Sequence, residues 1–259
     1  MGKAEPPGAD VLGAPGATLR ARDAVAITIG IVVGAGIFRT PSLVAGAASS
    51  EAMVYVAWIA GGLISLVGAL CYAELASAFP NAGGDYHFLK RAFGGRLSFL
   101  YAWARLSVIQ TGSVALLAFV FGDYASQIVS LGTYSSALYA AGAVVAITLV
   151  QWIGVRAGAR VQFWLTLAEI VGLTAVIVAG LLIAPAAPPQ VAVNEAGAFG
   201  LMMVFVLLTF GGWNEAAYVS AELKDAPRRM APVLMISLAI ITALYLLANA
   251  AYLRALGLV

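Results

Sequence analysis

The chain has 259 residues, of which 62 % are hydrophobic and 10 % are charged, and its formal net charge is +2. A soluble domain carries about a quarter charged residues and about half apolar ones, so this composition excludes an ordinary water-soluble globule. The single cysteine, Cys71, excludes a disulfide within the chain. Apolar stretches of ~20 residues recur along the sequence, which is typical of a helical protein that crosses the membrane several times.

Residues 1–22 are rich in Gly, Ala and Pro and show no apolar periodicity, so we expect a disordered cytoplasmic tail. Residues 23–259 are predicted to form one transmembrane domain. It contains seven apolar stretches that we predict to be spanning helices, at residues 24–46, 52–79, 97–122, 135–153, 161–183, 197–222 and 231–253.

The positive charges lie in alternate connections between these predicted spans. Eleven of the 14 Lys and Arg residues fall in the tail and in the connections after the second, fourth and sixth spans. The loops at 47–51, 123–134 and 185–196 contain no Lys or Arg. Because cytoplasmic loops carry the excess of these residues, the pattern predicts a cytoplasmic N-terminus.

Two predicted spans, the first and the sixth, are interrupted by glycines. The first contains Gly34-Ala35-Gly36-Ile37-Phe38, and the sixth contains Gly211-Gly212-Trp213-Asn214. One such run alone is readily explained by close helix packing. The two runs, however, lie five spans apart, and transporters built from inverted repeats place their broken helices at corresponding positions of the two halves. We therefore predict that both spans are broken inside the membrane.

A broken helix exposes backbone groups that can bind a charged ligand. The N-terminus of a half-helix that begins at residues 35–37 suits a carboxylate, and the carbonyl groups that end the preceding half-helix suit an ammonium group. A zwitterionic amino acid satisfies both ends at once. The breaks therefore favour an amino acid as the ligand.

Three separated motifs resemble the amino acid, polyamine and organocation (APC) transporter superfamily. They are the run from Gly34 to Phe38, the stretch from Leu70 to Tyr86, and the run from Gly211 to Asn214. Within the superfamily, the third span and the Gly-Gly-Trp-Asn run are most similar to the L-type amino acid transporters. The resemblance implies an all-α polytopic membrane protein with the LeuT-type 5+5 inverted-repeat fold. The chain would then hold the complete first repeat and the first two spans of the second, and so be truncated after its seventh helix.

The resemblance also implies that the substrate lies between the first and sixth helices. The Ala35 and Gly36 N–H groups would contact its carboxylate, and the Val32 and Gly211 carbonyls would accept from its ammonium group. Leu208 stands where L-type proteins usually carry an aromatic gate. The candidate substrate-binding residues are Val32, Gly34, Ala35, Gly36, Ile37, Leu208, Gly211, Gly212 and Asn214, the last of which would contact the ligand or brace the break.

Glu169, in the fifth predicted span, is the candidate for ion coupling. L-type relatives usually carry a lysine at this place. Glu169 lies eight residues past Val161, which puts it about 12 Å into the membrane at ~1.5 Å per residue. An ionised carboxyl group is costly at that depth and usually serves function. Two interpretations remain open: Glu169 binds H⁺ or Na⁺ during transport, or it is a structural carboxyl paired with a basic residue such as Arg105.

The function that fits these features is secondary active transport of amino acids by alternating access. We expect a multi-pass protein of the plasma membrane, which would be the inner membrane of a bacterium. The alternatives are a seven-span receptor or sensor, whose N-terminus usually lies outside, and a truncated permease remnant that does not transport. The chain has only one His and one Cys, which are the residue types that catalysis and metal binding most often use. We therefore expect no enzyme activity, cofactor or metal site. We expect no nucleic-acid partner. The loop at 123–134 lacks cysteine, so the disulfide that ties heteromeric animal relatives to a heavy chain cannot form there.

Overall fold

The computed structural model describes residues 19–79, 81, 83–185, 198–215 and 223–258. Five of the described helices are long and apolar enough to cross a membrane, and a bent pair of shorter helices makes a sixth. A shorter apolar helix follows at Phe199–Glu215. The chain is therefore an all-α protein with several membrane spans, as its composition predicted.

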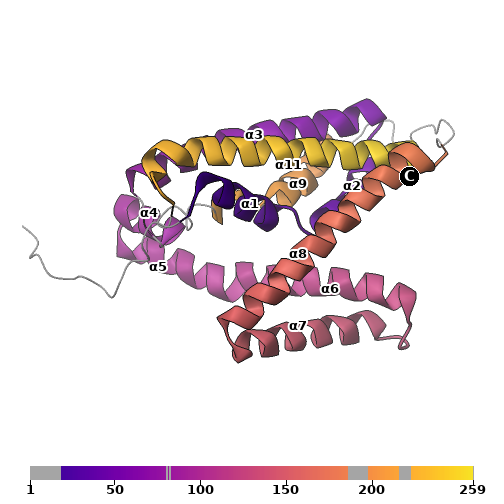
Figure 1. The fold of residues 1–259 in the computed structure, drawn as a ribbon, viewed down its shortest axis with the longest axis horizontal. Helices are drawn as coiled ribbons and strands as arrows, with labels where there is room; N and C mark the ends of the chain where they lie inside the picture. The colour runs from indigo at the N-terminus through magenta and orange to yellow at the C-terminus, as the bar shows by residue number, and fades with distance from the viewer. Residues whose placement is uncertain (1–18, 80, 82, 186–197, 216–222, 259) are drawn as a thin grey trace, which may run out of the picture.

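The helices follow one another as shown in Figure 1. They are α1 (Ala21–Val32), α2 (Gly36–Gly46), α3 (Glu51–Ala78), α4 (Gly84–Phe93), α5 (Gly95–Ala104), α6 (Gln110–Ile128), α7 (Ser135–Ile153), α8 (Val155–Val178), α9 (Phe199–Phe210) and α11 (Ala226–Leu256). Two π-helical turns, η1 (Arg105–Ile109) and η2 (Ala179–Ile183), continue α5 into α6 and extend α8. A 3₁₀ turn, η3 (Trp213–Glu215), follows α9.

The helix bounds follow the predicted spans, with three main extensions. The helix of the fifth span begins at Val155 instead of residue 161, and those of the third and seventh spans are also longer than predicted. The helix of the third span runs on to Ile128, past the acidic residue Asp123, whose side chain is paired with Arg39 and Ser136. The helix of the seventh span begins at Ala226, because a proline next to its start suits the first turn, where no backbone donor is needed. Most of the predicted tail (residues 1–18), residues 186–197 and the last part of the sixth predicted span (residues 216–222) lie outside the described residues.

The core of the molecule lies between α3 and α11, which run side by side, with α1, α2 and α9 packed against them (Figure 1). Glycines on α3 allow this approach. A Cβ atom at Gly61 would overlap the Val206 side chain of α9, and one at Gly62 would lie 2.6 Å from Thr242 Oγ1 of α11. The backbone of α3 therefore lies close to both neighbouring helices, which is the use of small residues in membrane helix packing.

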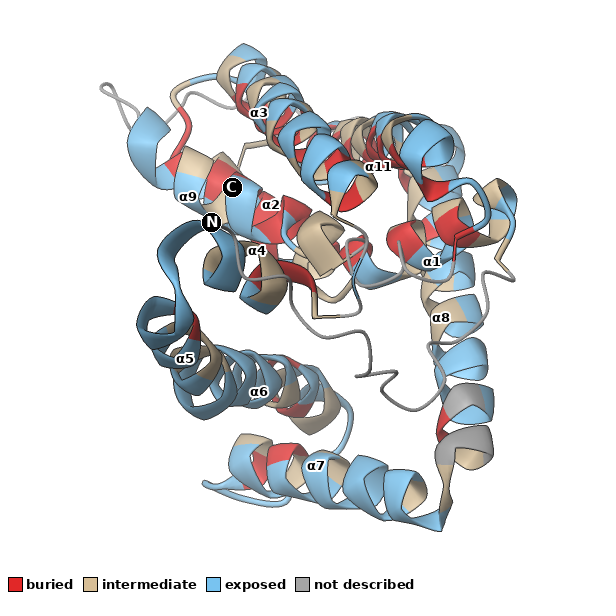
Figure 2. Ribbon diagram, turned by 90° about the vertical axis from the view of Figure 1, so that its left-hand side faces the viewer, coloured by how far each residue is buried: buried red, intermediate tan, exposed pale blue. Residues whose placement is uncertain are grey.

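A second group consists of α5, α6 and α7, and α8 connects it to the core group (Figure 2). Helices α6 and α7 pack on each other as an antiparallel hairpin. Only 6 % of the most apolar stretch of each of these spans is buried, against 39 % for α3 and for α11. The apolar surface of the hairpin is therefore largely exposed among the described residues.

Candidate functional site

The first predicted break lies between α1 and α2, where the chain bends by 53°. Helix α1 ends at Val32, Val33 is extended with φ −73° and ψ 111°, and α2 begins at Gly36. Within the described part of the chain, the backbone N–H groups of Ala35 and Gly36 have no backbone partner. Free N–H groups at a helix N-terminus form a ready site for an anion.

The second break follows Phe210, the last residue of α9. Gly211 is extended, with φ −56° and ψ 157°, and Gly212 has φ +104°. Residues with a side chain rarely adopt such a positive φ, so glycine is needed at this point. The chain then resumes as η3. The glycine run therefore ends α9, and residues 216–222, where the second half-helix is predicted, lie outside the described residues.

The two breaks lie against each other. A Cβ atom at Gly212 would lie 3.2 Å from Ile31 Cγ2 and 3.4 Å from the Ile31 carbonyl oxygen in α1. A Cβ atom at Gly36 would lie 3.2 Å from Thr209 Cγ2 in α9. The fold thus places the end of α1 beside the second break and the start of α2 beside α9.

Tyr245, on α11, joins the two breaks and was not among the predicted site residues. Its hydroxyl lies 3.0 Å from the Val32 carbonyl oxygen and 3.2 Å from that of Thr209. The side chain is fully buried, and its ring packs against Trp58 and Phe210 at centroid distances of 5.4 Å and 5.1 Å. The Val32 carbonyl, which we expected to face an ammonium group, is therefore already a hydrogen-bond acceptor, with a second lone pair available.

The other predicted residues have different surroundings. Ile37 is fully buried. Gly34 faces open space, because a Cβ atom there would have no other atom within 4 Å. Leu208 is 66 % exposed on α9. Asn214 points to the start of α4, where its amide nitrogen lies 3.5 Å from Asp85 Oδ2. In this structure Asn214 thus contacts α4, and both predicted roles of Asn214 stay predictions.

A network of charged groups lies just after the second break. Arg105 of η1 forms ion pairs with Asp85 Oδ2 at 3.0 Å and with Glu215 Oε1 at 2.6 Å. The Tyr101 hydroxyl donates to the same Asp85 oxygen at 2.6 Å. Asp85 is 5 % exposed, and its Oδ1 atom is buried without a partner among the described residues. The network connects the N-terminal part of the third span to α4 and to η3.

A second polar contact ties α2 to the other end of the third span. Arg39 Nη1 lies 3.0 Å from Asp123 Oδ2, and Ser136 of α7 donates to Asp123 Oδ1 at 2.6 Å. The Tyr124 hydroxyl donates to the Phe38 carbonyl at 3.2 Å. The half-helix that follows the first break is therefore held by α6.

Glu169 lies on the face of α8 that turns toward α1 and α11. Thr166, one turn earlier, is the residue nearest to Gly30 of α1, at 3.6 Å from a Cβ atom built there. Glu169 is also near enough to Tyr245 for an electrostatic interaction. Among the described residues Glu169 forms no ion pair, and Arg105 forms ion pairs with Asp85 and Glu215. The basic residue suggested for a structural pair with Glu169 is thus engaged elsewhere.

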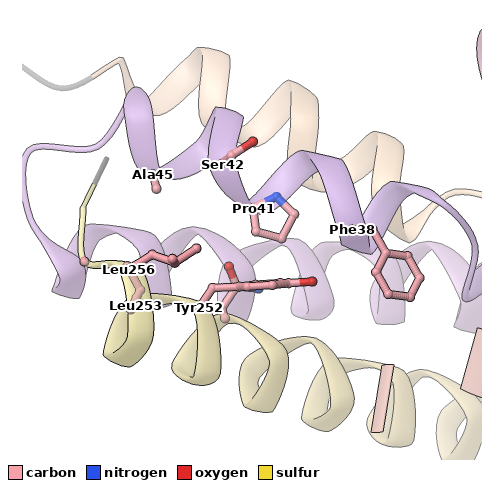
Figure 3. Close-up of a pocket in the computed structure, with 9 residues that line it drawn as sticks. Phe38, Pro41, Ser42, Ala45, Tyr252, Leu253 and Leu256 are labelled. Atoms are coloured by element: carbon pink, nitrogen blue, oxygen red, sulfur yellow. The ribbon is translucent and has the colours of Figure 1, made fainter. Parts of the chain in front are cut away.

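A cavity of about 130 Å³ lies between α2 and the end of α11, and neither Glu169 nor Arg105 lines it. Figure 3 shows Phe38 and Pro41 on one wall and Tyr252 and Leu256 on the other. Its lining is mainly apolar, and none of the predicted substrate-binding residues belongs to it. Phe38, the last residue of the first glycine run, nevertheless lies in its wall.

Comparison with known proteins identifies a family that matches this chain. Residues 19–258 match the family model described as "Amino acid permease". The "b(0,+)-type amino acid transporter 1" of Mus musculus is 30 % identical over 239 residues, which cover 88 % of this chain and 49 % of that protein. The "Large neutral amino acids transporter small subunit 2" of Oryctolagus cuniculus and that of Homo sapiens are each 32 % identical over 248 residues, covering 90 % of this chain and 46 % of each relative. The chain spans about half the length of the curated relatives it matches.

Proposed function

The chain belongs to the amino acid permease family, a family of transporters rather than enzymes, and on this premise we propose that it is a secondary transporter of amino acids. It works by alternating access across the bacterial plasma membrane, with a cytoplasmic N-terminus. Its helices form the first repeat and the first two spans of the second repeat of a 5+5 inverted-repeat fold. No disulfide-linked heavy chain is attached through the loop at 123–134.

The close approach of the two breaks carries this proposal. The free N–H groups of Ala35 and Gly36 bind the substrate carboxylate, because a helix N-terminus carries about half a positive charge. The Val32 and Gly211 carbonyls lie at helix ends, where the partial charge is negative, and they accept hydrogen bonds from the α-ammonium group. Both ends of one zwitterion are then satisfied without a charged side chain.

Binding and exchange experiments test the proposal. We expect amino acids to raise the melting temperature of the purified chain, and dipeptides and nucleotides to leave it unchanged. In proteoliposomes loaded with unlabelled amino acid, we expect uptake of the labelled amino acid by counterflow. A receptor or a non-transporting remnant would bind amino acids without counterflow, and that result would contradict transport by this chain.

A matched pair of glycine variants connects the activity to the breaks. Gly212→Ala places a side chain at φ +104° and 3.2 Å from Ile31, so it should weaken amino acid binding by at least tenfold. Gly142→Ala, on α7 with open space around its Cβ position, serves as the control and should bind as the unmodified chain does. Equal binding by the two variants would place the substrate site elsewhere.

We also propose that Glu169 couples transport to a proton or to Na⁺. This proposal is supported by its place on the α8 face toward α1 and by the absence of an ion pair with any described residue. Glu169→Gln keeps the size of the side chain and removes the charge, so uptake should lose its dependence on pH or on sodium. A Glu169→Gln variant that transports with unchanged dependence on both would rule out coupling through this residue.

A further inference from the structure

We propose that anionic phospholipid headgroups bind to a basic patch at the place where α1 and α11 begin. The basic patch consists of five exposed side chains from two segments that are far apart in the sequence: Arg20, Arg22, Lys224, Arg228 and Arg229. This surface is separate from the two breaks, and its partner is the membrane rather than the transported substrate.

The backbone holds the two segments of the patch together. Leu19 and Leu223 pair as an isolated β-bridge, in which the Lys224 N–H donates to the Leu19 carbonyl at 3.0 Å. Both helices begin within three residues of this bridge, at the end of the molecule where α4 lies (Figure 1). Ala24, Leu223 and Met230 are each only 2 % exposed. Because these three side chains face the core, the basic side chains between them point outward.

The charges of the patch are not neutralised within the described part of the chain. Residues 19–24 and 223–229 contain five basic residues and two acidic ones, Asp23 and Asp225. Asp23 lies 3.6 Å from Arg22 in an exposed ion pair. The other four basic side chains form no ion pair with any described residue. The two segments therefore carry a local excess of three positive charges.

Helix stability does not explain the two arginines of α11. Arg228 and Arg229 are its third and fourth residues, and its first turn contains no acidic residue. The N-terminus of a helix carries about half a positive charge, so basic residues are unfavourable there. Lys90 and Arg91, by contrast, lie in the last turn of α4, where basic residues are favourable, and Arg91 also lies 4.2 Å from the centroid of the Phe79 ring. Arg228 and Arg229 thus favour an anion from outside the chain.

The position of the patch identifies this anion as a lipid headgroup. The apolar stretches 24–46 and 231–253 each begin two residues after an arginine of the patch, Arg22 and Arg229. Two residues correspond to a rise of about 3 Å, so these side chains lie at the boundary between hydrocarbon and water. The phosphates of phospholipids lie at this level, and a leaflet with anionic lipids attracts basic residues next to a membrane span. Phosphatidylglycerol fits this chemistry.

Titration with a short-chain lipid tests the binding. Dihexanoyl phosphatidylglycerol is added to the purified chain in a neutral detergent, and the melting temperature is measured. We expect the melting temperature to rise with this lipid and to stay unchanged with dihexanoyl phosphatidylcholine or with inorganic phosphate. The rise should shrink at high salt, because exposed charges are screened. An equal rise with inorganic phosphate would show a site for free anions and overturn the proposal.

Two double variants assign the binding to the patch. Arg228→Gln/Arg229→Gln and Lys90→Gln/Arg91→Gln each remove two positive charges from the predicted cytoplasmic side. We expect the first to weaken phosphatidylglycerol binding about tenfold, since each basic residue near an anionic headgroup contributes several-fold, and the second to leave it unchanged. Arg20→Gln, on the other segment, should weaken it several-fold. Equal weakening by the two double variants would show attraction by overall charge and contradict a site at the patch.

The same variants separate lipid binding from folding. Without phosphatidylglycerol, Arg228→Gln/Arg229→Gln should melt at the same temperature as the unmodified chain or higher, because it removes cations from the N-terminus of α11. A lower melting temperature without lipid would assign the two arginines to the fold itself and overturn the proposal. None of these outcomes depends on amino acid transport, so the proposed function is tested separately.

Discussion

The cost of a buried charge is most evident at Asp85. Its carboxyl group is 5 % exposed and depends on Arg105 for an ion pair, on Tyr101 for a hydrogen bond and more weakly on Asn214. A buried charge that loses its partner is strongly destabilising, whereas removal of both partners together is often tolerated. Arg105 also reaches Glu215 on the other side of the network, so one guanidinium serves two carboxylates.

Arg105→Gln should therefore lower the free energy of unfolding by about 3–5 kcal/mol, because the carboxylate of Asp85 stays buried without its cation. The double variant Arg105→Gln/Asp85→Asn should recover much of that loss. Thermal unfolding of the purified chain measures both. Arg22→Gln is the control, since the Arg22–Asp23 pair is well exposed. A loss in Arg105→Gln no larger than in Arg22→Gln would contradict the assigned role.

At the scale of elements, glycines decide how closely helices approach. The α6–α7 hairpin has few buried side chains, yet α6 and α7 touch closely at Gly122, where a Cβ atom would overlap the Ser136 carbonyl. The next residue, Asp123, accepts a hydrogen bond from the Ser136 hydroxyl. Because the obstructing atom belongs to the backbone, it cannot turn away as a side chain could. Gly122 thus sets the spacing of this hairpin.

Gly122→Ala should push α7 away from α6 and destabilise the chain by about 1–3 kcal/mol, as overpacking does. Gly112→Ala lies on the same helix with open space around its Cβ position, so it controls for the change in helix propensity and should be neutral or stabilising. Melting temperatures of the two variants give the comparison. Equal values would show that α6 and α7 are not in close contact at Gly122.

Across the described part of the molecule, the helix of the third span holds the segments that follow the breaks, α2 after the first and η3 after the second. Arg105, in η1, is paired with Glu215 after the second break, and Asp123, in α6, is paired with Arg39 after the first. The two positions are 18 residues apart in the sequence, or about 27 Å along the helix at ~1.5 Å per residue. They are therefore separated by roughly the thickness of a bilayer core of ~30 Å. In this structure both contacts are formed, so α2 and η3 are each held by the helix of the third span.

Under the proposed function the site opens to one side at a time, and we expect each opening to release one of these contacts. Arg39→Gln removes the ion pair of α2 while leaving the Arg105 network intact, so α2 should move away from α6 more readily. We expect a cysteine placed at Ser42 in a Cys71→Ala background to react several-fold faster with a water-soluble maleimide when Arg39 is Gln. A cysteine at Ser77, on α3, is the control and should react at an unchanged rate. No difference at Ser42 would show that the ion pair does not hold α2.

Much of the architecture could be predicted from the sequence, because it depends on local properties. Hydropathy and length identify a helix without reference to any distant residue, and the fourth predicted span, 135–153, has the same bounds as α7. Glycine at positions 34 and 36 and at 211 and 212 weakens a helix whatever surrounds it, so the breaks could be placed as well. The family resemblance came from the same runs of residues and agrees with the family match.

The partners of the polar groups were decided only by the tertiary structure. Tyr245 lies in an apolar span that contains no motif, and its aromatic ring is common in such spans. The sequence therefore did not indicate that its hydroxyl contacts both breaks. Arg105 was visible as a charge in a span, but its partner Glu215 is 110 residues away. A sequence shows where a buried polar group must find a partner, because the cost of burial is local. Which partner it finds depends on how the helices pack, and that is a property of the folded chain.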